Sequence, residues 1–141
     1  MKVALFGGTG FVGSYIINKL IDSGFSPKVL VRKGSESKLV SDCEIVYGDI
    51  GDKKSIKETI RDTDAIIYNI GIIREFPSKG ITYTRLHYEG VRLCIQIAEE
   101  MNVKRFILMS ANGAKLNGTG YQSSKFQAEQ EVQNSNLQWT I

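Results

Sequence analysis

Two side chains near the end of the chain have the types and spacing needed to exchange a proton with a substrate. Tyr121 and Lys125 lie four residues apart in the stretch Tyr-Gln-Ser-Ser-Lys, and this spacing places both on one face of a helix. An ammonium group beside a phenol favours the phenolate form, so Tyr121 is suited to act as a general acid or base. Lys125 is also suited to hold the hydroxyls of a ribose. The alternative is an exposed Tyr above an exposed Lys without chemistry.

A glycine-rich loop near the start of the chain predicts a binding site for a pyrophosphate. The stretch Gly-Gly-Thr-Gly-Phe-Val-Gly at residues 7–13 follows an apolar segment and opens a segment with helical spacing. Gly7 permits a tight strand-to-helix turn, Gly10 lets the backbone approach a pyrophosphate, and Gly13 lets the helix pack closely on the strand. The alternative is a purely structural turn, but the strand before and the helix after favour dinucleotide binding. The expected binding residues here are Gly7, Thr9, Gly10, Phe11, Val12 and Gly13.

Apolar strands and helices alternate along the chain and would bring these groups together. We expect strands at residues 2–6, 28–31, 44–47, 65–69, 105–109 and 138–141, and helices at residues 10–23, 52–61, 82–101 and 121–134. Strict alternation predicts an α/β fold with a doubly wound parallel sheet, right-handed crossovers and helices on both faces, which is the Rossmann fold. Asp52 is expected to cap the second helix, and Trp139 is expected in the core of the last strand.

Two adjacent cations follow the second expected strand. Arg32 stands about where an acidic residue would bind the adenosine ribose of NAD. Arg32 and Lys33 instead suit a 2′-phosphate, through charge-assisted contacts. We therefore favour NADP as the cofactor, with NAD as the alternative. If neither cation binds a nucleotide, both are solvated surface charges.

Residues at the ends of the third and fourth strands complete the expected nucleotide site. Asp49 follows the third strand with Ile50 beside it, and its carboxylate could accept a hydrogen bond from an adenine amino group or serve as an ordinary turn residue. Asn69 and Gly71 follow the fourth strand, and Gly71 would let the nicotinamide-side ribose pass close to the backbone.

Composition excludes several other classes of protein. The 141 residues suffice for one domain with a core. The net charge of +3 forms no basic run dense enough for nucleic acid. No apolar stretch approaches the length of a membrane span, and no signal peptide is recognised. Two cysteines form no disulfide framework, so a reducing, cytoplasmic compartment fits best. His87 is the only histidine and has no partners at metal spacing, so we expect a role in packing or on a helix surface, and no metal.

The chain resembles the short-chain dehydrogenase/reductase superfamily in its extended or atypical branch. The resemblance covers the whole chain and rests on residues 7–13, Gly48-Asp49, Tyr68-Asn69-Ile70-Gly71 and the Tyr121 to Lys125 stretch. Residues 71–75, 86–90, 109–114 and 137–141 look like the group related to the 39-kDa accessory subunit of respiratory complex I and to NmrA-type proteins, which is epimerase/dehydratase-like.

The resemblance implies an oxidoreductase that transfers a hydride between nicotinamide and a carbonyl or alcohol of a small molecule. Tyr121 would be the proton donor or acceptor, and Ser110 the third catalytic residue. Lys125 would favour the phenolate form of Tyr121 and hold the ribose hydroxyls. Extended enzymes usually carry the catalytic hydroxyl two residues later, where this chain has Asn112. This departure keeps open the alternative of a non-catalytic dinucleotide-binding accessory, assembly or redox-sensing protein.

The resemblance also implies a further region. In the superfamily the last strand leads to a C-terminal substrate-binding part that this sequence lacks. Residues 1–141 are therefore expected to be the NAD(P)-binding domain at the N-terminal side of a longer protein. An apolar sheet edge left exposed would favour association, so we expect the chain either to form a homodimer or to be poorly stable.

Overall fold

The computed structural model describes residues 1–39 and 42–141, and its centre is one sheet of six parallel strands. The strands lie in the order β3-β2-β1-β4-β5-β6, and every neighbouring pair is parallel. All carboxyl ends therefore meet at one edge of the sheet. The strand order reverses between β1 and β4, which is where such sheets bind ligands. The bounds are β1 Lys2–Phe6, β2 Ser26–Val31, β3 Glu44–Tyr47, β4 Ala65–Tyr68, β5 Arg105–Leu108 and β6 Gln138–Thr140.

Four α-helices connect the described strands. They are α1 Phe11–Asp22, α2 Lys53–Ile60, α3 Gly90–Glu100 and α4 Gly120–Asn134. Of these, α1, α2 and α4 match the expected helices within two residues at each end. One expected helix differs in kind, because its first part is the π-helix η3, Thr84–Glu89, which runs directly into α3. Two short 3-10 turns, η1 Glu36–Lys38 and η2 Pro77–Lys79, lie in the loops. Asp52 caps α2 as expected, through the backbone N–H groups of Lys54 and Ser55.

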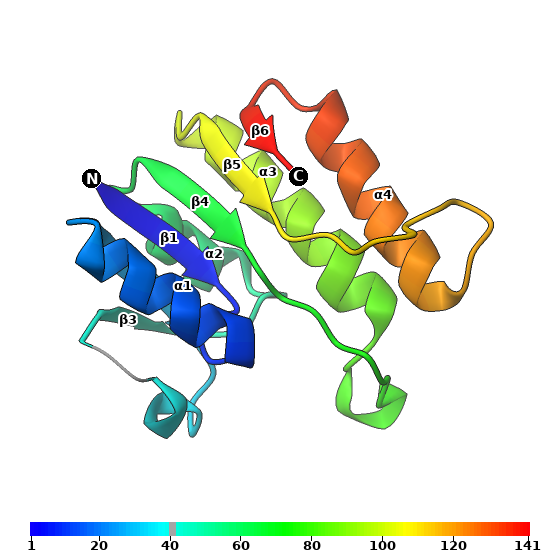
Figure 1. Ribbon diagram of the computed structural model, residues 1–141, viewed down its shortest axis with the longest axis horizontal. Helices are drawn as coiled ribbons and strands as arrows, with labels where there is room; N and C mark the ends of the chain where they lie inside the picture. Colours follow the sequence, from blue (N-terminus) through cyan, green and yellow to red (C-terminus); the bar gives the residue numbers. More distant parts are fainter. Residues whose placement is uncertain (40–41) are drawn as a thin grey trace.

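The helices cover both faces of the sheet, but unequally. On one face α1 contributes Ile17 to a small cluster with Leu5, Val29 and Val31 of the strands. On the other face α2, α3 and α4 pack on a much larger cluster, whose largest members are Tyr68, Phe6 and Phe106. Figure 1 shows α1 in front of the sheet and α2 and α3 behind it. The doubly wound fold is therefore confirmed.

Trp139 lies at the edge of the sheet, and the expectation that it is buried is wrong. Its strand β6 pairs only with β5, where Trp139 is in register with Phe106. The side chain is 43% exposed because no described strand lies beyond β6. Burial of a residue in an edge strand depends on what covers the edge, and its own strand pattern does not provide that information.

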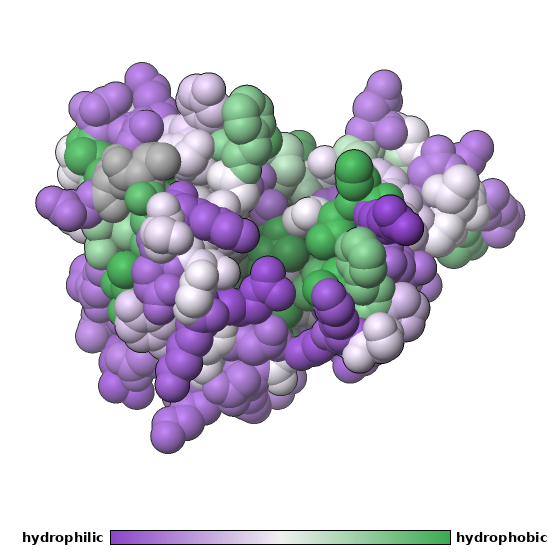
Figure 2. Space-filling model, turned by 90° about the horizontal axis from the view of Figure 1, so that it is seen from below, coloured by the Kyte–Doolittle hydropathy of each residue, from purple (hydrophilic) through white to green (hydrophobic). Residues whose placement is uncertain are grey.

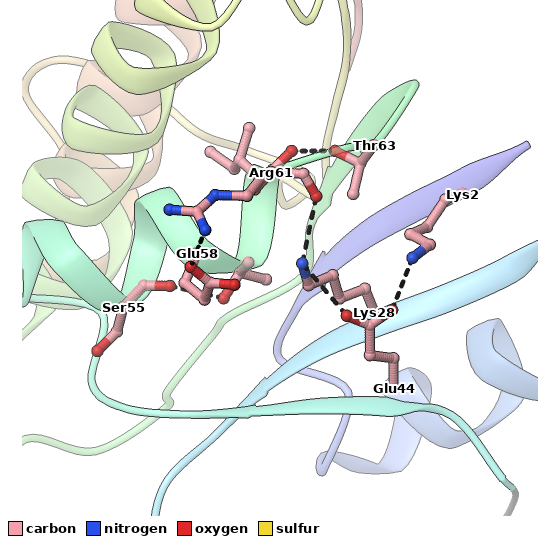
Figure 3. A network of polar contacts seen from close by, with 9 residues as sticks. Lys2, Lys28, Glu44, Ser55, Glu58, Arg61 and Thr63 are labelled. Atoms are coloured by element: carbon pink, nitrogen blue, oxygen red, sulfur yellow. Dashed lines mark hydrogen bonds and ion pairs between the residues drawn. The ribbon is translucent and has the colours of Figure 1, made fainter.

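A network of charges ties together the amino-terminal part of the sheet, away from the carboxyl edge (Figure 3). Glu44 on β3 pairs with Lys2 of β1 at 2.7 Å and with Lys28 of β2 at 3.3 Å. Lys28 is only 3% exposed and also donates a hydrogen bond to the carbonyl oxygen of Arg61 at 3.2 Å. A nearly buried ammonium group is tolerated here because two acceptors face it.

In the described part of the chain no helix combines the length and the apolar character that crossing a membrane requires.

Candidate functional site

A hollow lies at the carboxyl edge of the sheet, beside the point where the strand order reverses. Figure 2 views the molecule from that side and shows a hydrophobic floor surrounded by hydrophilic groups. The hollow, called the groove below, brings together residues from the ends of four strands. Most of the expected cofactor-binding residues line it, namely Gly7, Thr9, Gly10, Arg32, Asp49, Ile50, Asn69 and Gly71.

Three glycines of the loop after β1 have different physical roles. Gly7 has a φ of 96°, and a Cβ there would lie 2.8 Å from the carbonyl carbon of Asn69. A Cβ on Gly13 would collide with the backbone of Gly8 at 2.7 Å. A Cβ on Gly10 would have no protein atom nearer than the oxygen of Gly7 at 3.5 Å. The fold therefore requires glycine at 7 and 13, whereas at Gly10 the missing side chain leaves space for something outside the protein.

The N-terminus of α1 lacks the side-chain cap that two other helices have. Asp52 caps α2, and Thr119 caps α4 in a capping box with Gln122. No side chain caps α1 at Gly10, and its first turn contains no acidic residue. Free N–H groups and the helix dipole there suit a phosphate, so the residues present fit a pyrophosphate. The side chains of Phe11 and Val12 are exposed, which leaves their backbone N–H groups as the expected contacts.

The two cations expected at the adenosine ribose lie differently. Arg32 lines the groove, whereas Lys33 is exposed and is not among the lining residues. The structure thus brings only Arg32 to the other expected nucleotide-binding residues. A role for Lys33 in binding a 2′-phosphate stays a prediction.

Asp49 is engaged by a residue that sequence reasoning missed. One oxygen, Oδ1, accepts hydrogen bonds from the backbone N–H of Gly51 at 2.9 Å and from Nη2 of Arg85 at 2.5 Å. Arg85 also donates from Nη1 to the carbonyl oxygen of Gly80 at 3.0 Å. Arg85 therefore links the loop after β3 to the segment of residues 72–81, parts of which line the groove. No local pattern in the sequence marked Arg85.

Lys125 is buried where β4 and β5 end. The side chain is 3% exposed, and Nζ donates hydrogen bonds to the carbonyl oxygens of Met109 at 3.0 Å and Ile70 at 3.4 Å. Burial lowers the pKa of Lys125 to about 8, although Glu129, one helical turn further on, opposes this shift. Lys125 therefore holds a fixed position beside Ile70 and Gly71, which line the groove.

Tyr121 stands one helical turn before Lys125, with its ring held by two other aromatic rings. The Tyr121 ring meets His87 edge-on with centroids 5.2 Å apart, and meets Tyr83 in the same way at 5.8 Å. Tyr121 is half-buried. The two neighbouring rings restrict the side chain of Tyr121, which is not among the residues that line the groove.

The Ser110 hydroxyl is paired with a carboxylate. Ser110 donates a hydrogen bond to Oε1 of Glu129 at 2.5 Å, and Asn112 is exposed. A catalytic role for Ser110 therefore stays a prediction, and in this arrangement its proton points to Glu129. Sequence reasoning missed Glu129, although its position four residues after Lys125 on one helix face was a usable signal.

His87 is buried in η3 and joins two segments. Its Nε2 lies 3.0 Å from the backbone N–H of Ile72, and its Nδ1 lies 2.9 Å from Oγ of Ser124. The side chain is 1% exposed, and burial, together with the charge of Lys125, lowers the pKa of His87 to about 4. The buried position agrees with the packing role expected from the sequence. Across the described residues, no three His, Cys, Asp or Glu side chains gather in a metal-binding group.

The parallel sheet, the glycine loop before an uncapped helix and the groove at the topological reversal together define a Rossmann-type dinucleotide-binding domain. Comparison with known families agrees. The chain belongs to the NAD(P)H-binding family, whose family model matches residues 7–141. The ligand of this family, and accordingly of the chain, is a nicotinamide dinucleotide.

Individual relatives are distant but match most of this chain. Ceramide reductase of Caulobacter vibrioides is 29% identical, over 92% of this chain and 41% of its own length. The mitochondrial NADH-ubiquinone oxidoreductase 40 kDa subunit of Neurospora crassa is 28% identical, over 97% of this chain and 38% of its own length. The Photosystem II assembly factor Ycf39 of Trieres chinensis is 25% identical, over the whole chain and 44% of its own length. The chain thus spans less than half the length of these relatives.

A solved structure shows the same arrangement. A protein of Bacillus halodurans, provisionally described as an NAD-dependent epimerase/dehydratase, superposes with a TM-score of 0.84 at 25% identity. The match covers all of this chain and 68% of the other. The resemblance to epimerase/dehydratase-like and complex I subunit-like proteins is therefore confirmed.

Proposed function

We propose that the chain binds NADP in the groove and supports hydride transfer between nicotinamide and a carbonyl or alcohol of a small molecule, with Tyr121 as proton donor or acceptor. The observation that carries this proposal is the placement of Lys125. Its ammonium group is buried against the ends of β4 and β5, one helical turn from Tyr121. Tyr121 and Lys125 thus share one face of α4, which is the spacing that the proposed proton transfer requires.

Each part of the groove has a role in this proposal. Gly7, Gly10 and the first turn of α1 hold the pyrophosphate, and Arg32 faces the adenosine ribose. Gly71 and Lys125 hold the ribose next to the nicotinamide. When bound, the nicotinamide dinucleotide supplies or accepts the hydride. The hydroxyl of Tyr121 gives a proton to the substrate oxygen during reduction and takes it back during oxidation.

The segment of residues 72–81 is the proposed border of the substrate site. It carries an antiparallel bridge between Phe76 and Ile81, and Tyr83 fastens it by donating from its hydroxyl to the carbonyl oxygen of Ile73 at 2.8 Å. Since this chain spans less than half of its relatives' length, we propose that segments outside residues 1–141 complete the substrate pocket.

The test compares Tyr121→Phe with the wild type in the full-length protein, which includes the segments that complete the proposed substrate pocket. We expect the variant to lose about a hundredfold or more in reduction of a panel of aldehydes and ketones, while its dissociation constant for NADPH changes less than about threefold. Tyr88→Phe is the matched control, because the Tyr88 hydroxyl donates to Glu131 at 3.1 Å and has no part in the proposed chemistry. Unchanged turnover in Tyr121→Phe would overturn the proposed role.

A second candidate function is a non-catalytic dinucleotide-binding accessory or assembly protein. Ser110 favours this candidate because its hydroxyl is paired with Glu129, and so does the exposed Asn112. Two relatives are named as a photosystem assembly factor and a respiratory-enzyme subunit. Binding of NADPH by a wild-type protein that reduces none of the panel would favour this second candidate.

A further inference from the structure

A directed series of hydrogen bonds runs through His87 from the groove to α4. The backbone N–H of Ile72 donates to Nε2 of His87, so Nε2 has no proton. In the neutral ring the proton is then on Nδ1, and Nδ1 donates to Oγ of Ser124. Ser124 in turn donates its own proton to the carbonyl oxygen of Tyr121 at 3.0 Å. Each donor in the series has one acceptor, so the series has a single direction.

The two ends of this series have different surroundings. Ile72 lines the groove, whereas Tyr121 begins the helical turn that leads to Lys125. His87 lies between them in η3, stacked on Tyr83 with ring centroids 5.5 Å apart. A π-helix turn, such as the one that carries His87, occurs frequently at functional sites.

We infer that His87 is a positioning residue, which fixes the turn of Tyr121 relative to the groove wall at Ile72. The inference rests on the proposed function, because it assigns to His87 the orientation of the proposed proton donor. In this assignment His87 makes no contact with the ligand; its ring packs against the ring of Tyr121, and its Nδ1 reaches the Tyr121 carbonyl oxygen through Ser124. The ring must be the Nδ1–H form, since a proton on Nε2 would leave the Ile72 N–H facing another donor.

The first experiment measures the ring directly, which is straightforward because His87 is the only histidine of the chain. Nitrogen-15 NMR of the full chain at pH 7 should show a single imidazole with protonated Nδ1 and unprotonated Nε2. An imidazole with protonated Nε2, or one that averages between both forms, would overturn the inference. No cofactor is needed for this measurement, so its outcome does not depend on the proposed function.

The second experiment removes the middle of the series with Ser124→Ala. This small change should preserve the fold while it removes the acceptor for Nδ1–H. We expect hydrogen exchange at the Ile72 amide to become at least about fivefold faster, although Ser124 does not contact Ile72. Ser123→Ala is the control, because Ser123 lies on the same helical turn as Ser124 but outside the series. Its hydroxyl donates to the carbonyl oxygen of Leu116 at 2.8 Å. Equal exchange in the two variants would overturn the inference.

The third readout separates positioning from a merely structural role. At saturating NADPH, Ser124→Ala should lower turnover about tenfold while the KM for NADPH stays within about twofold of the wild type. Unchanged turnover would overturn the positioning role. If the full-length wild type turns over no substrate, the proposed function fails, and the NMR and exchange results then decide whether His87 holds Ile72 and Tyr121 together.

Discussion

Arg85 donates a hydrogen bond to Asp49 beside the groove, with Nη2 2.5 Å from Oδ1. The same guanidinium donates to the carbonyl oxygen of Gly80. The loop after β3 and the segment of residues 72–81 are thus held at a fixed separation by one side chain. Because residues of both segments line the groove, we expect this link to influence the width of the groove where Asp49 lies.

Arg85→Ala should therefore weaken binding of NADPH and NADH to the same extent. We expect a three- to tenfold rise in both dissociation constants, or about 0.6–1.4 kcal/mol, because the ion pair is partly exposed and its effect is limited. Isothermal titration calorimetry would measure both nucleotides. Arg92→Ala is the control, since its guanidinium lies over the Tyr88 ring and is exposed. A loss confined to one nucleotide would contradict a role in groove width.

Arg32 should instead distinguish the two nucleotides. Arg32→Asp is expected to weaken NADPH binding by about tenfold or more, through loss of contacts with the 2′-phosphate, and to leave NADH binding nearly unchanged. Lys33→Asp should have a smaller effect, since Lys33 does not line the groove. Competition titrations with both nucleotides would measure the difference. Equal affinity of the wild type for NADH and NADPH would remove the case for Arg32.

The glycine loop was predictable because the requirement for glycine is local. Gly7 needs a positive φ, and Gly13 faces the backbone of its own loop, so spacing along the chain contains the information. The parallel sheet was predictable for a similar reason, because alternating strands and helices leave few topologies. The expected cofactor residues at strand ends then followed from the fold.

The polar partners of the site were not predictable in the same way. Arg85 and Asp49 are 36 residues apart, and their meeting depends on the π-helical turn before α3, which no sequence pattern announced. Ser110 has a partner on α4, so its hydroxyl direction depends on packing between β5 and that helix. Such contacts follow from the positions of whole elements and not from local residue types.

Glu44 should matter more for stability than its exposure suggests. It neutralises Lys28, which is nearly buried, so Glu44→Gln leaves a buried ammonium with a weaker partner. We expect the free energy of unfolding to fall by about 1–2 kcal/mol, because Glu44 itself remains partly in solvent. Glu58→Gln is the matched control, since its pair with Arg61 is exposed on both sides and should change stability by less than about 0.5 kcal/mol. Urea denaturation would measure both, and equal losses would contradict the argument.

His87 should make the protein less stable as the pH is lowered from 7 to 5. Its pKa is lowered to about 4 in the folded chain, whereas the unfolded chain has the ordinary value near 6.5. Between these two pKa values the unfolded chain binds more protons than the folded chain. The free energy of unfolding therefore decreases as the pH is lowered, by about 2 kcal/mol from pH 7 to pH 5. His87→Gln has no titrating group and should show a much smaller fall over this range in urea denaturation. The same slope in both proteins would show that His87 does not cause the effect.

Trp139 should report association of the exposed sheet edge. Among the described strands none pairs with the outer side of β6, and the side chains of Trp139 on β6 and of Ile141 just after it are 43% and 40% exposed. Unpaired strand edges favour pairing with another chain. We expect sedimentation equilibrium to show a dimer that forms with increasing concentration, and the fluorescence of the only tryptophan to shift to shorter wavelength as it forms. Trp139→Lys should prevent the dimer, because a charge on an edge opposes pairing. Tyr47→Lys on β3, the opposite edge, is the control and should not affect it. A wild-type chain that stays monomeric at all concentrations, or a dimer lost equally in both variants, would rule out association through β6.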